Sequence, residues 1–375
     1  STRITAFDIA PDGTAFATGY GDGSIIVTPV AVIGAPASRS IAKAHLSTVL
    51  SLRFFPSSIV LLSSSSDLSL AIHDAKLASS SAANAAPSST PLTTVRSLRA
   101  HSAGVTECGI IDRGRNVVSF SRDASVRLWN VGEGKEIVGR RWRAPKGSPV
   151  LCGCIGKTWR EAGPEPPVQE ISISPLAGEV GTQGKRVFVG LQDGSIRGYD
   201  LYTGAPRFFS SGRRSGAASI QPSPVDSISY SSEYSILVAG RRDGIVRVWD
   251  LEAVGQISPS APGGEQDKEN ALGEEYDAPP TWCFRRNTAG IEGVFVLPTV
   301  DEATDRSPPG VKMVLIASAD GLICKVGLAA GAVPTLLEEF VGIESGDGVR
   351  GVKAVVTDGI MSVWCASDDG SVRKY

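Results

Sequence analysis

Short runs of alternating apolar and polar residues recur along the whole chain. Seven times, one such run leads through a turn centred on an aspartate into a second run of the same kind. These turns lie at Asp22, Asp67, Asp123, Asp193, Asp243, Asp320 and Asp369. Alternation with a period of two predicts half-buried β-strands, and an Asp-Gly-like turn between two such strands predicts a hairpin. The pattern therefore predicts an all-β chain that contains seven hairpins.

The seven aspartates are separated by 45 to 77 residues, which is more than a hairpin needs. A repeat of about 40–45 residues holds four strands, so the surplus residues are expected to form insertions. The insertions are residues 77–94, 157–185, 253–280 and 299–310. The first has a low-complexity sequence, and residues 253–280 are acidic and rich in Pro and Gly, so both are expected to form flexible loops.

A histidine precedes two of the turns at the same distance. His45 lies 22 residues before Asp67, His101 lies 22 residues before Asp123, and Trp129 follows Asp123 by six residues. A His in the loop before the inner strand, a Ser on the second strand, the turn Asp and a Trp on the third strand can form a buried chain of hydrogen bonds. For the third repeat we expect this structural relay to consist of His101, Ser119 or Ser121, Asp123 and Trp129.

The same residue types could form a nucleophilic Ser-His-Asp triad. Single members of the set recur in other repeats, however, and the whole chain contains three His. The structural interpretation is therefore favoured, and we expect no catalytic residues and no enzymatic activity.

Composition narrows the functional class further. A net charge of −2 gives no reason to expect nucleic-acid binding, and no apolar run reaches the length of about 18 residues that a membrane helix needs. The six Cys are scattered and no glycosylation sequon occurs, which favours a reduced protein of the cytoplasm or nucleus.

Cys152-Gly-Cys154 could be a metal or redox pair. Without a second pair or a nearby His, two thiols on a strand are the favoured interpretation, and no cofactor or metal is expected.

The seven hairpins resemble those of the WD-repeat family, which implies a seven-bladed WD40-type β-propeller in a single domain of residues 1–375. The expected blades are residues 1–44, 45–100, 101–144, 145–212, 213–286, 287–341 and 342–375. Outer strands are expected at Ser40–Lys43 and Val95–Leu98. The seventh hairpin ends at Tyr375, so we expect the last blade to lack its closing outer strand and residues upstream of Ser1 to supply it.

A narrower resemblance lies in Ile110–Ser119, followed by Ser125–Trp129. The turn Asp112-Arg113-Gly114-Arg115-Asn116 is similar to that of the proteasomal ATPase-associated factors, most of all their fungal form. Leu52–Ser57, Gln169–Ser172 and Gly181–Lys185 resemble the same family. The resemblance implies a non-enzymatic chaperone that binds the C-terminal domain of a proteasomal ATPase subunit, together with other base-assembly intermediates of the regulatory particle. We also expect a monomer located in the cytoplasm and nucleus.

Two charged groups are candidate partner-binding residues, because propellers present their loops and turns together on one face. The acidic group is Glu344, Asp347 and Asp368, with Arg350 nearby, and the basic group is Arg122, Arg241 and Arg242. Charge reversal at Asp347 and Asp368 is expected to weaken binding and to leave stability nearly unchanged, because exposed charges contribute little to folding. The alternative for these residues is an ordinary solvated surface.

Two other functions fit the fold less well. A substrate receptor or scaffold of a ubiquitin ligase usually carries an Arg two positions after a Trp-Asp pair, but Trp249-Asp250 is followed by Leu251-Glu252. Lys268-Glu269-Asn270 resembles a degradation signal, although a tripeptide occurs easily by chance. A propeller hydrolase is disfavoured by the shortage of His and of paired acids.

Overall fold

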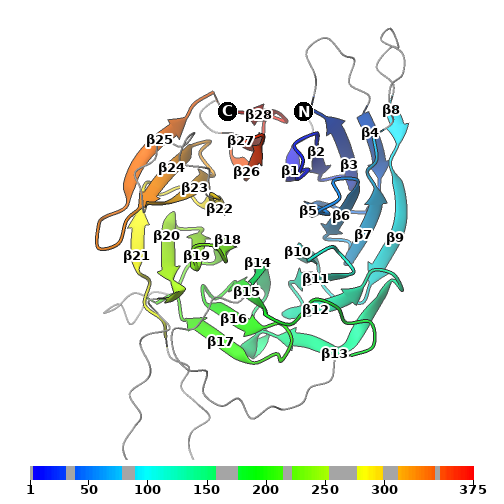
Figure 1. Ribbon diagram of the computed structural model, residues 1–375, viewed down its shortest axis with the longest axis horizontal. Coiled ribbons are helices and arrows are strands. Elements are labelled where there is room, and N and C mark those ends of the chain that lie inside the picture. The colour runs from blue at the N-terminus through cyan, green and yellow to red at the C-terminus, as the bar shows by residue number, and fades with distance from the viewer. Residues whose placement is uncertain are drawn as a thin grey trace, which may run out of the picture.

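The computed structural model shows seven β-sheets arranged as blades around a central opening (Figure 1). It describes residues 3–30, 39–77, 89–157, 176–213, 222–252, 277–298, 311–342 and 347–375. The first strand of each blade faces the opening, and the last strands lie at the periphery. The blade that carries the C-terminal end lies next to the blade that carries the N-terminal end. The predicted all-β fold with seven blades is confirmed.

Each blade is an antiparallel meander whose strands follow one another outward. Blade 1 contains β1 (Ile4–Ile9), β2 (Ala15–Tyr20), β3 (Ser24–Pro29) and β4 (Arg39–Lys43). Blade 2 contains β5 (Val49–Phe54), β6 (Val60–Ser65), β7 (Ser69–Asp74) and β9 (Thr93–Arg99). Blade 3 contains β10 (Val105–Ile111), β11 (Asn116–Ser121), β12 (Ser125–Asn130) and β13 (Lys135–Arg143), and a short 3-10 turn, Pro145–Gly147, follows it.

The later blades continue the same order. Blade 4 contains β14 (Val150–Lys157), β15 (Lys185–Leu191), β16 (Ile196–Asp200) and β17 (Pro206–Ser210). Blade 5 contains β18 (Val225–Ser231), β19 (Ile236–Arg241), β20 (Ile245–Asp250) and β21 (Trp282–Arg285). Blade 6 contains β22 (Ile291–Val296), β23 (Lys312–Ser318), β24 (Ile323–Leu328) and β25 (Thr335–Phe340). Blade 7 contains β26 (Val349–Thr357), β27 (Ile360–Ser367) and β28 (Val372–Lys374).

The first and last blades depart from the four-stranded pattern. Among the described residues blade 7 is a three-stranded sheet that ends at β28, as predicted from the position of the seventh hairpin. Blade 1 has a fifth strand, β8 (Ser89–Pro91), which pairs in parallel with β4 and comes from the segment between β7 and β9. The outer strands expected in blades 1 and 2 are confirmed as β4 and β9.

Every inner strand carries a β-bulge at the same place. The register of the ladder shifts between the first and third residues of the strand, as between Val105 and Glu107 in β10. The bulge removes the second residue from regular pairing and re-aims its side chain. These seven bulge residues are Thr5, Leu50, Thr106, Leu151, Asp226, Glu292 and Arg350. Three of them carry charges, and all three lie in blades 5 to 7.

The hydrophobic core lies between neighbouring blades rather than inside any one of them. In one cluster Leu70 and Leu98 of blade 2 pack with Val117 and Trp129 of blade 3. Close approach of the sheets needs small residues: a Cβ on Gly153 would lie 2.4 Å from the Phe120 ring. Ile4 and Phe7 of blade 1 pack against Trp364 of blade 7, and this contact closes the ring.

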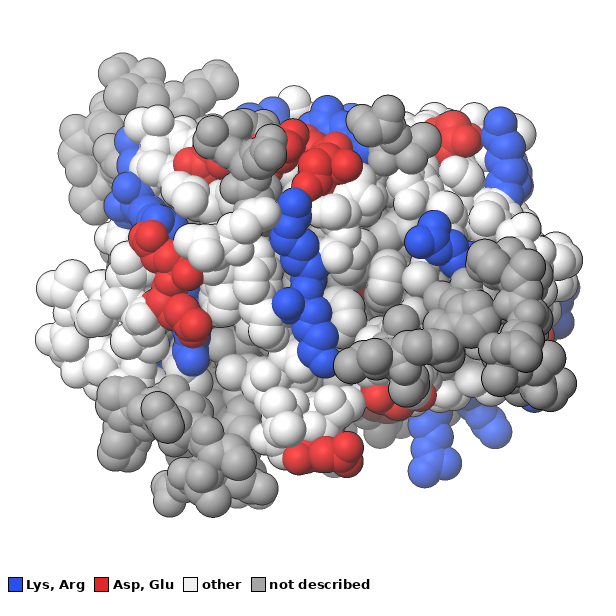
Figure 2. All heavy atoms as spheres, turned by 90° about the horizontal axis from the view of Figure 1, so that it is seen from above, with Lys and Arg blue, Asp and Glu red and all other residues white. Residues whose placement is uncertain are grey.

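The outer surface mixes both signs of charge, in keeping with a net charge of −2. Figure 2 views the edge of the ring and shows acidic and basic side chains interspersed among uncharged ones on that side. Among the described residues, no helix has the length and apolar character needed to cross a membrane. Most of the residues of the predicted insertions lie outside the described ranges, as do Gln169–Ser172 and Lys268-Glu269-Asn270.

Candidate functional site: the turn face of the propeller

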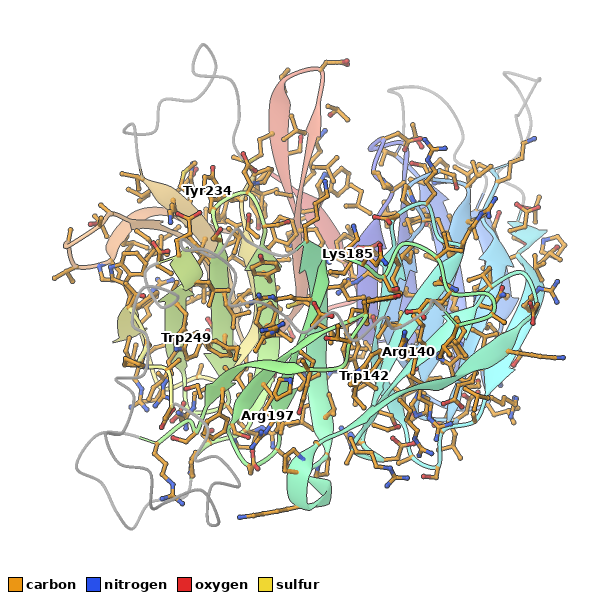
Figure 3. The ribbon with its side chains drawn as sticks, turned by 60° about the horizontal axis from the view of Figure 1, so that its bottom comes forward. Arg140, Trp142, Lys185, Arg197, Tyr234 and Trp249 are labelled. Carbon is orange, nitrogen blue, oxygen red and sulfur yellow. The ribbon has the colours of Figure 1, made fainter. Side chains whose placement is uncertain are left out.

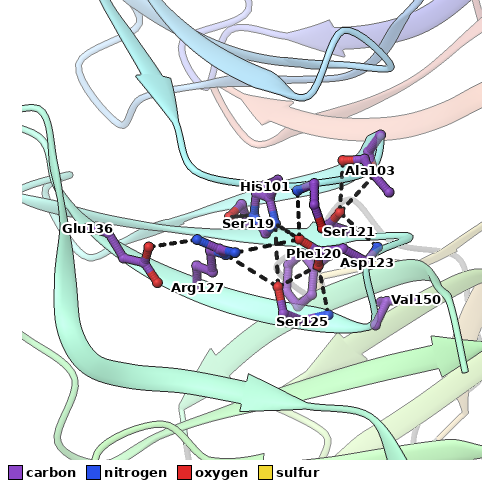
Figure 4. A network of polar contacts seen from close by, with 12 residues as sticks. His101, Ala103, Ser119, Phe120, Ser121, Asp123, Ser125, Arg127, Glu136 and Val150 are labelled. Carbon is purple, nitrogen blue, oxygen red and sulfur yellow. Dashed lines mark hydrogen bonds and ion pairs between the residues drawn. The ribbon is translucent and has the colours of Figure 1, made fainter. Parts of the chain in front are cut away.

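The turn face is the side of the ring that carries the aspartate turns and the loops leading into the inner strands. In blade 3 the predicted relay is present there (Figure 4). His101 Nδ1 lies 2.8 Å from Asp123 Oδ2, and His101 Nε2 lies 2.7 Å from Ser119 Oγ. Trp129 Nε1 donates to the same Ser119 hydroxyl at 2.8 Å. Of the two serines considered, Ser119 is therefore the relay member, and Ser121 instead donates to the carbonyls of Ala103 and Gly104.

The donors of this relay fix the position of each proton. The Trp129 N–H can only donate, so the Ser119 oxygen accepts from it and the Ser119 O–H donates to His101 Nε2. The remaining proton of His101 then lies on Nδ1 and is donated to Asp123. The chain of hydrogen bonds thus runs from the third strand through the second strand and the lead-in loop to the turn, and it fixes these four parts of the blade relative to one another.

The same geometry would suit a nucleophilic triad, but access excludes that role. Ser119 is fully buried, and Trp129 and His101 occupy both sides of its hydroxyl. Burial by itself would raise the pKa of Asp123, yet the hydrogen bonds from His101 and Ser125 outweigh it and hold that pKa below its ordinary value. The carboxylate is therefore a permanent acceptor that also caps the loop through the Ser102 N–H at 3.1 Å.

Blade 2 repeats the relay with a histidine in place of the tryptophan. His45 contacts Asp67 at 3.1 Å and Ser63 at 2.7 Å, and His73 Nε2 lies 2.8 Å from the same Ser63 hydroxyl. His73 Nδ1 lies 3.1 Å from Thr94 Oγ1. An N–H on Nε2 lets His73 donate to Ser63 as Trp129 donates to Ser119. Burial lowers the pKa of His73 and the nearby His45 adds to that effect, so that the pKa is about 3.

An arginine that we did not expect from the spacing of the repeats completes several of these turns. Arg127 is buried, its guanidinium lies 3.6 Å from Asp123, and it pairs with Glu136 at 2.7 Å. Arg373 stands in the same relation to Asp369 in blade 7. The signal was present in the sequence, because an Arg follows the turn Asp by four positions in the hairpins at Asp123, Asp193, Asp243 and Asp369.

The predicted acidic group is neutralised in the structure. Arg350 forms a bidentate contact with Asp368 at 2.7 and 2.9 Å, and Arg3 contacts the same carboxylate at 2.6 and 2.7 Å. Arg350 also reaches Glu292 at 3.1 Å. The expectation of an exposed acidic patch at Asp368 was wrong, because ring closure places two guanidinium groups on that carboxylate. Asp347 is half-buried in the lead-in loop of blade 7, and Glu344 lies outside the described residues.

The predicted basic group divides into three different environments. Arg241 is 4% exposed and donates to the Gly212 carbonyl at 2.8 Å, so its assignment as a partner-binding residue was wrong. Arg242 has an exposed side chain but pairs with Asp226 at 2.8 and 3.0 Å. Arg122 is exposed, and its backbone N–H donates to the Gly104 carbonyl at 3.0 Å. Of the three, only Arg122 presents a guanidinium without a carboxylate partner among the described residues.

A cavity of about 670 Å³ opens along the centre of the ring, lined by residues of the inner strands. Arg53 bridges Asp8 at 3.7 Å and Glu107 at 3.2 Å, and Lys353 lies 3.6 Å from Asp8. Burial lowers the pKa of Lys353, and the neighbouring Arg53 adds to that effect. Two cations thus balance two carboxylates across blades 1, 2, 3 and 7, which ties the inner strands together.

Cys152 and Cys154 lie on β14 beside this cavity. Burial raises the pKa of both thiols above the ordinary value, so both are neutral near pH 7. No group of three or more His, Cys, Asp or Glu side chains within the described ranges is placed to hold a metal ion. Both cysteines are thus neutral thiols on one strand.

Away from the turn face, two segments of the narrower resemblance meet in space. Asp112 pairs with Lys185 at 2.5 Å, and Asn116 accepts from the Val180 N–H and donates to the Gly178 carbonyl. A buried ion pair between Arg140 and Glu179, at 3.0 Å, anchors the segment before β15 on blade 3. Figure 3 shows Arg140 beside Trp142 on β13, with Lys185 at the start of β15. The turn at Asp112–Asn116 is therefore a docking point for residues 176–185.

Comparisons with known proteins agree with the fold. The model of the WD domain, G-beta repeat, matches residues 92–130 and 218–250. The 26S proteasome regulatory subunit RPN14 of Saccharomyces cerevisiae is 30% identical over 230 residues, which is 60% of this chain and 48% of RPN14. The WD repeat-containing protein 91 homolog of Dictyostelium discoideum is 24% identical over 181 residues, 42% of this chain and 22% of that protein.

This chain thus spans about half of the length of RPN14 and about a fifth of the length of the Dictyostelium protein. The first matched segment contains most of blade 3, including Ser119, Asp123 and Trp129 of the relay. The second ends on β20 at Asp250, directly after Trp249. The ring of seven sheets is a β-propeller, and the WD-repeat model matches segments that contain inner strands of blades 3 and 5.

Proposed function

We propose that this protein is a non-enzymatic assembly chaperone that binds the C-terminal domain of a proteasomal ATPase subunit during assembly of the base of the regulatory particle. The observation that carries the proposal is the 30% identity to RPN14, a 26S proteasome regulatory subunit, over 60% of this chain. In this proposal the protein acts as a monomer in the cytoplasm and nucleus, bound to base-assembly intermediates.

The physical form of the molecule suits a protein-binding scaffold. The relays of blades 2 and 3 hold the lead-in loops against the turns, so the turn face presents loops on a rigid support. The relay serine is buried, which leaves its hydroxyl without access to a substrate. Contact between a preformed face and a folded partner domain requires no catalytic group.

Two of the segments that resemble the proteasomal ATPase-associated factors also contact each other in the structure. The turn at Asp112–Asn116 and the segment before Lys185 lie 73 positions apart at their ion pair, yet they form one docked unit. Segments that must fit each other are constrained together, so their joint resemblance supports the proposal more than either would by itself.

The direct test uses the purified protein and the separately purified C-terminal domains of the proteasomal ATPase subunits. We expect one of these domains to bind with a Kd of micromolar or below, measured by isothermal titration calorimetry, and the others to bind at least tenfold more weakly. Failure of all of them to bind would refute the proposal. Purification with a ubiquitin-ligase adaptor from cells, in the absence of any ATPase subunit, would favour the substrate-receptor function instead.

A further inference from the structure

Two leucines of blade 2 lie exposed on the turn face where a soluble surface would ordinarily carry polar residues. Leu46 is 84% exposed in the lead-in loop, and Leu68 is 41% exposed in the turn. The two are neighbours, because the Leu46 N–H donates to the carboxylate of Asp67 at 2.9 Å and Leu68 follows Asp67 directly. The turn and the loop therefore place two apolar side chains side by side at the rim of the face.

The apolar surface continues towards blade 3. Leu50 is the half-buried bulge residue of β5, and its Cδ1 would lie 3.8 Å from a Cβ on Gly104. The same Cβ would lie 3.2 Å from the Cα of Ser66 in the blade 2 turn. Because the Gly104 carbonyl accepts the Arg122 N–H at 3.0 Å, Arg122 borders this surface on the side of blade 3.

The charges at the border are positive and unpaired. Arg99 is exposed at the end of β9, where it lies opposite Ser69, the residue after Leu68. Neither Arg99 nor Arg122 forms an ion pair with another described residue. The turn aspartates of these two blades, Asp67 and Asp123, have side chains only 5% and 4% exposed, because the relays enclose them.

We propose that Leu46, Leu50, Leu68, Arg99 and Arg122, here called the apolar-basic sector, form the main contact for the protein partner, and that the partner contributes a segment with apolar side chains flanked by carboxylates. The proposal rests on the function proposed above and names the chemistry of the partner surface. Exposed leucines supply apolar area to bury, and unpaired arginines supply charge complementarity to an acidic segment.

The other charged half of the face is poorly suited to this role. Arg3, Asp226, Arg242, Glu292, Arg350 and Asp368, here called the paired-charge sector, satisfy one another at 2.6 to 3.1 Å. A partner that covered these groups would desolvate ion pairs that already exist and would gain little new interaction. In measured interfaces a few residues near the centre of the contact carry most of the affinity, and arginine is enriched among them.

The first experiment measures binding of the ATPase domain to variants of the full chain by calorimetry. Leu46→Asp and Arg122→Glu are each expected to weaken binding about tenfold or more, and the Arg122→Glu loss should shrink as salt is raised. Val138→Asp and Arg113→Glu are the matched controls. Val138 is 86% exposed on the outer strand β13, and Arg113 is exposed in a turn at the opposite end of β11 from Arg122. Both controls should bind within about twofold of the unchanged protein.

The second experiment tests the sector without any ATPase domain. Three synthetic amphipathic peptides share one apolar face and carry acidic, neutral or basic flanks, and their binding is measured by fluorescence anisotropy. The acidic peptide should bind at least about tenfold more tightly than the basic one, and Leu46→Asp and Arg122→Glu should remove that preference while Val138→Asp keeps it.

The outcomes separate the two proposals. Binding of an ATPase domain that Leu46→Asp and Arg122→Glu leave unchanged would overturn the apolar-basic sector and leave the proposed function intact. Equal binding of the acidic and basic peptides would overturn it too. If no ATPase domain binds but the acidic peptide binds at these residues, the sector stands and the proposed function fails.

Discussion

Blades 2 and 3 and blades 5 to 7 treat their charged side chains in opposite ways on the same face of the ring. In blades 2 and 3 the carboxylates of Asp67 and Asp123 are enclosed by histidine and serine, and arginines remain exposed outside. In blades 5 to 7 the carboxylates of Asp226, Glu292 and Asp368 lie at the surface and each is paired with an arginine. One half is thus braced from within, and the other is held by ion pairs across the blades.

The difference shows that a count of charges on a surface does not identify a binding site. The paired-charge sector holds as many arginines as carboxylates, so its groups are committed to one another. Burial raises the pKa of Glu292, and the neighbouring Asp226 and Asp368 raise it further, which is why Arg350 is needed there. The apolar-basic sector has fewer charges, but they are available. The next four experiments test this contrast, in order of decreasing expected effect.

The largest effect should come from removing the tryptophan that ends the blade 3 relay. Trp129 is 1% exposed and packs between blades 2 and 3, so Trp129→Ala removes a large buried ring and the donor to Ser119. We expect a loss of about 3–5 kcal/mol in the free energy of unfolding, measured by urea denaturation. Trp129→Phe keeps most of the ring and should cost clearly less. Equal losses for both variants would mean that the hydrogen bond from the indole N–H, and not the packing of the ring, stabilises the blade.

The second effect is a dependence of stability on pH. It is expected from His73 in the relay of blade 2 and not from Trp129, which occupies the equivalent position in blade 3. His73 has a folded-state pKa of about 3, so between that value and its ordinary value of about 6.5 the unfolded chain binds the extra proton. Stability is therefore full above about pH 6.5 and falls as the pH is lowered, by roughly 2 kcal/mol between pH 7 and pH 5.

His73→Gln provides the comparison, because its side-chain amide can still donate to Ser63 and does not titrate. Urea unfolding at pH 7 and pH 5 should show that the unchanged protein loses about 2 kcal/mol more than this variant over that interval. Identical pH dependence in the two proteins would contradict the assignment of a buried, neutral His73. Tryptophan at the equivalent position in blade 3 has no such titration.

The third effect is a difference in stability between charge-reversed variants of Asp368 and Asp347. Asp368→Lys would put an ammonium group against both Arg3 and Arg350, so we expect a loss of roughly 1–2 kcal/mol, reduced from the value for a fully buried pair because the site is partly solvated. Asp347→Lys should change stability by less than about 0.5 kcal/mol. The sequence led us to expect little change at both positions. Thermal denaturation of the two variants decides between these expectations, and an unchanged melting temperature for Asp368→Lys would contradict the paired-charge sector.

The smallest effect on folding is expected in the apolar-basic sector. Leu46→Ser and Arg122→Ala change exposed side chains without ion-pair partners among the described residues, so stability should stay within about 0.5 kcal/mol. A clear loss in urea denaturation would show that these residues support the fold, and it would break the contrast between the two halves of the face.

The sequence by itself determined the parts of the structure that depend on local spacing. Alternation sets which side of a sheet a residue faces, so the hairpins and the seven blades could be predicted from the chain alone. The relay could be predicted for the same reason: His101, Ser119, Asp123 and Trp129 belong to one blade, and their separations along the chain place them together. The three-stranded last blade likewise followed from the position of its hairpin.

Only the tertiary structure decided which side chains of different blades meet. Arg3 and Asp368 are 365 positions apart and meet because the ring closes, and Arg241 is buried because the Gly212 carbonyl from blade 4 lies over it. No periodicity records such contacts, since they depend on how the blades are placed side by side. The same lateral packing leaves Arg122 exposed and encloses Asp123 one residue later. Of these two neighbours, Arg122 therefore belongs to the proposed binding surface and Asp123 to the relay.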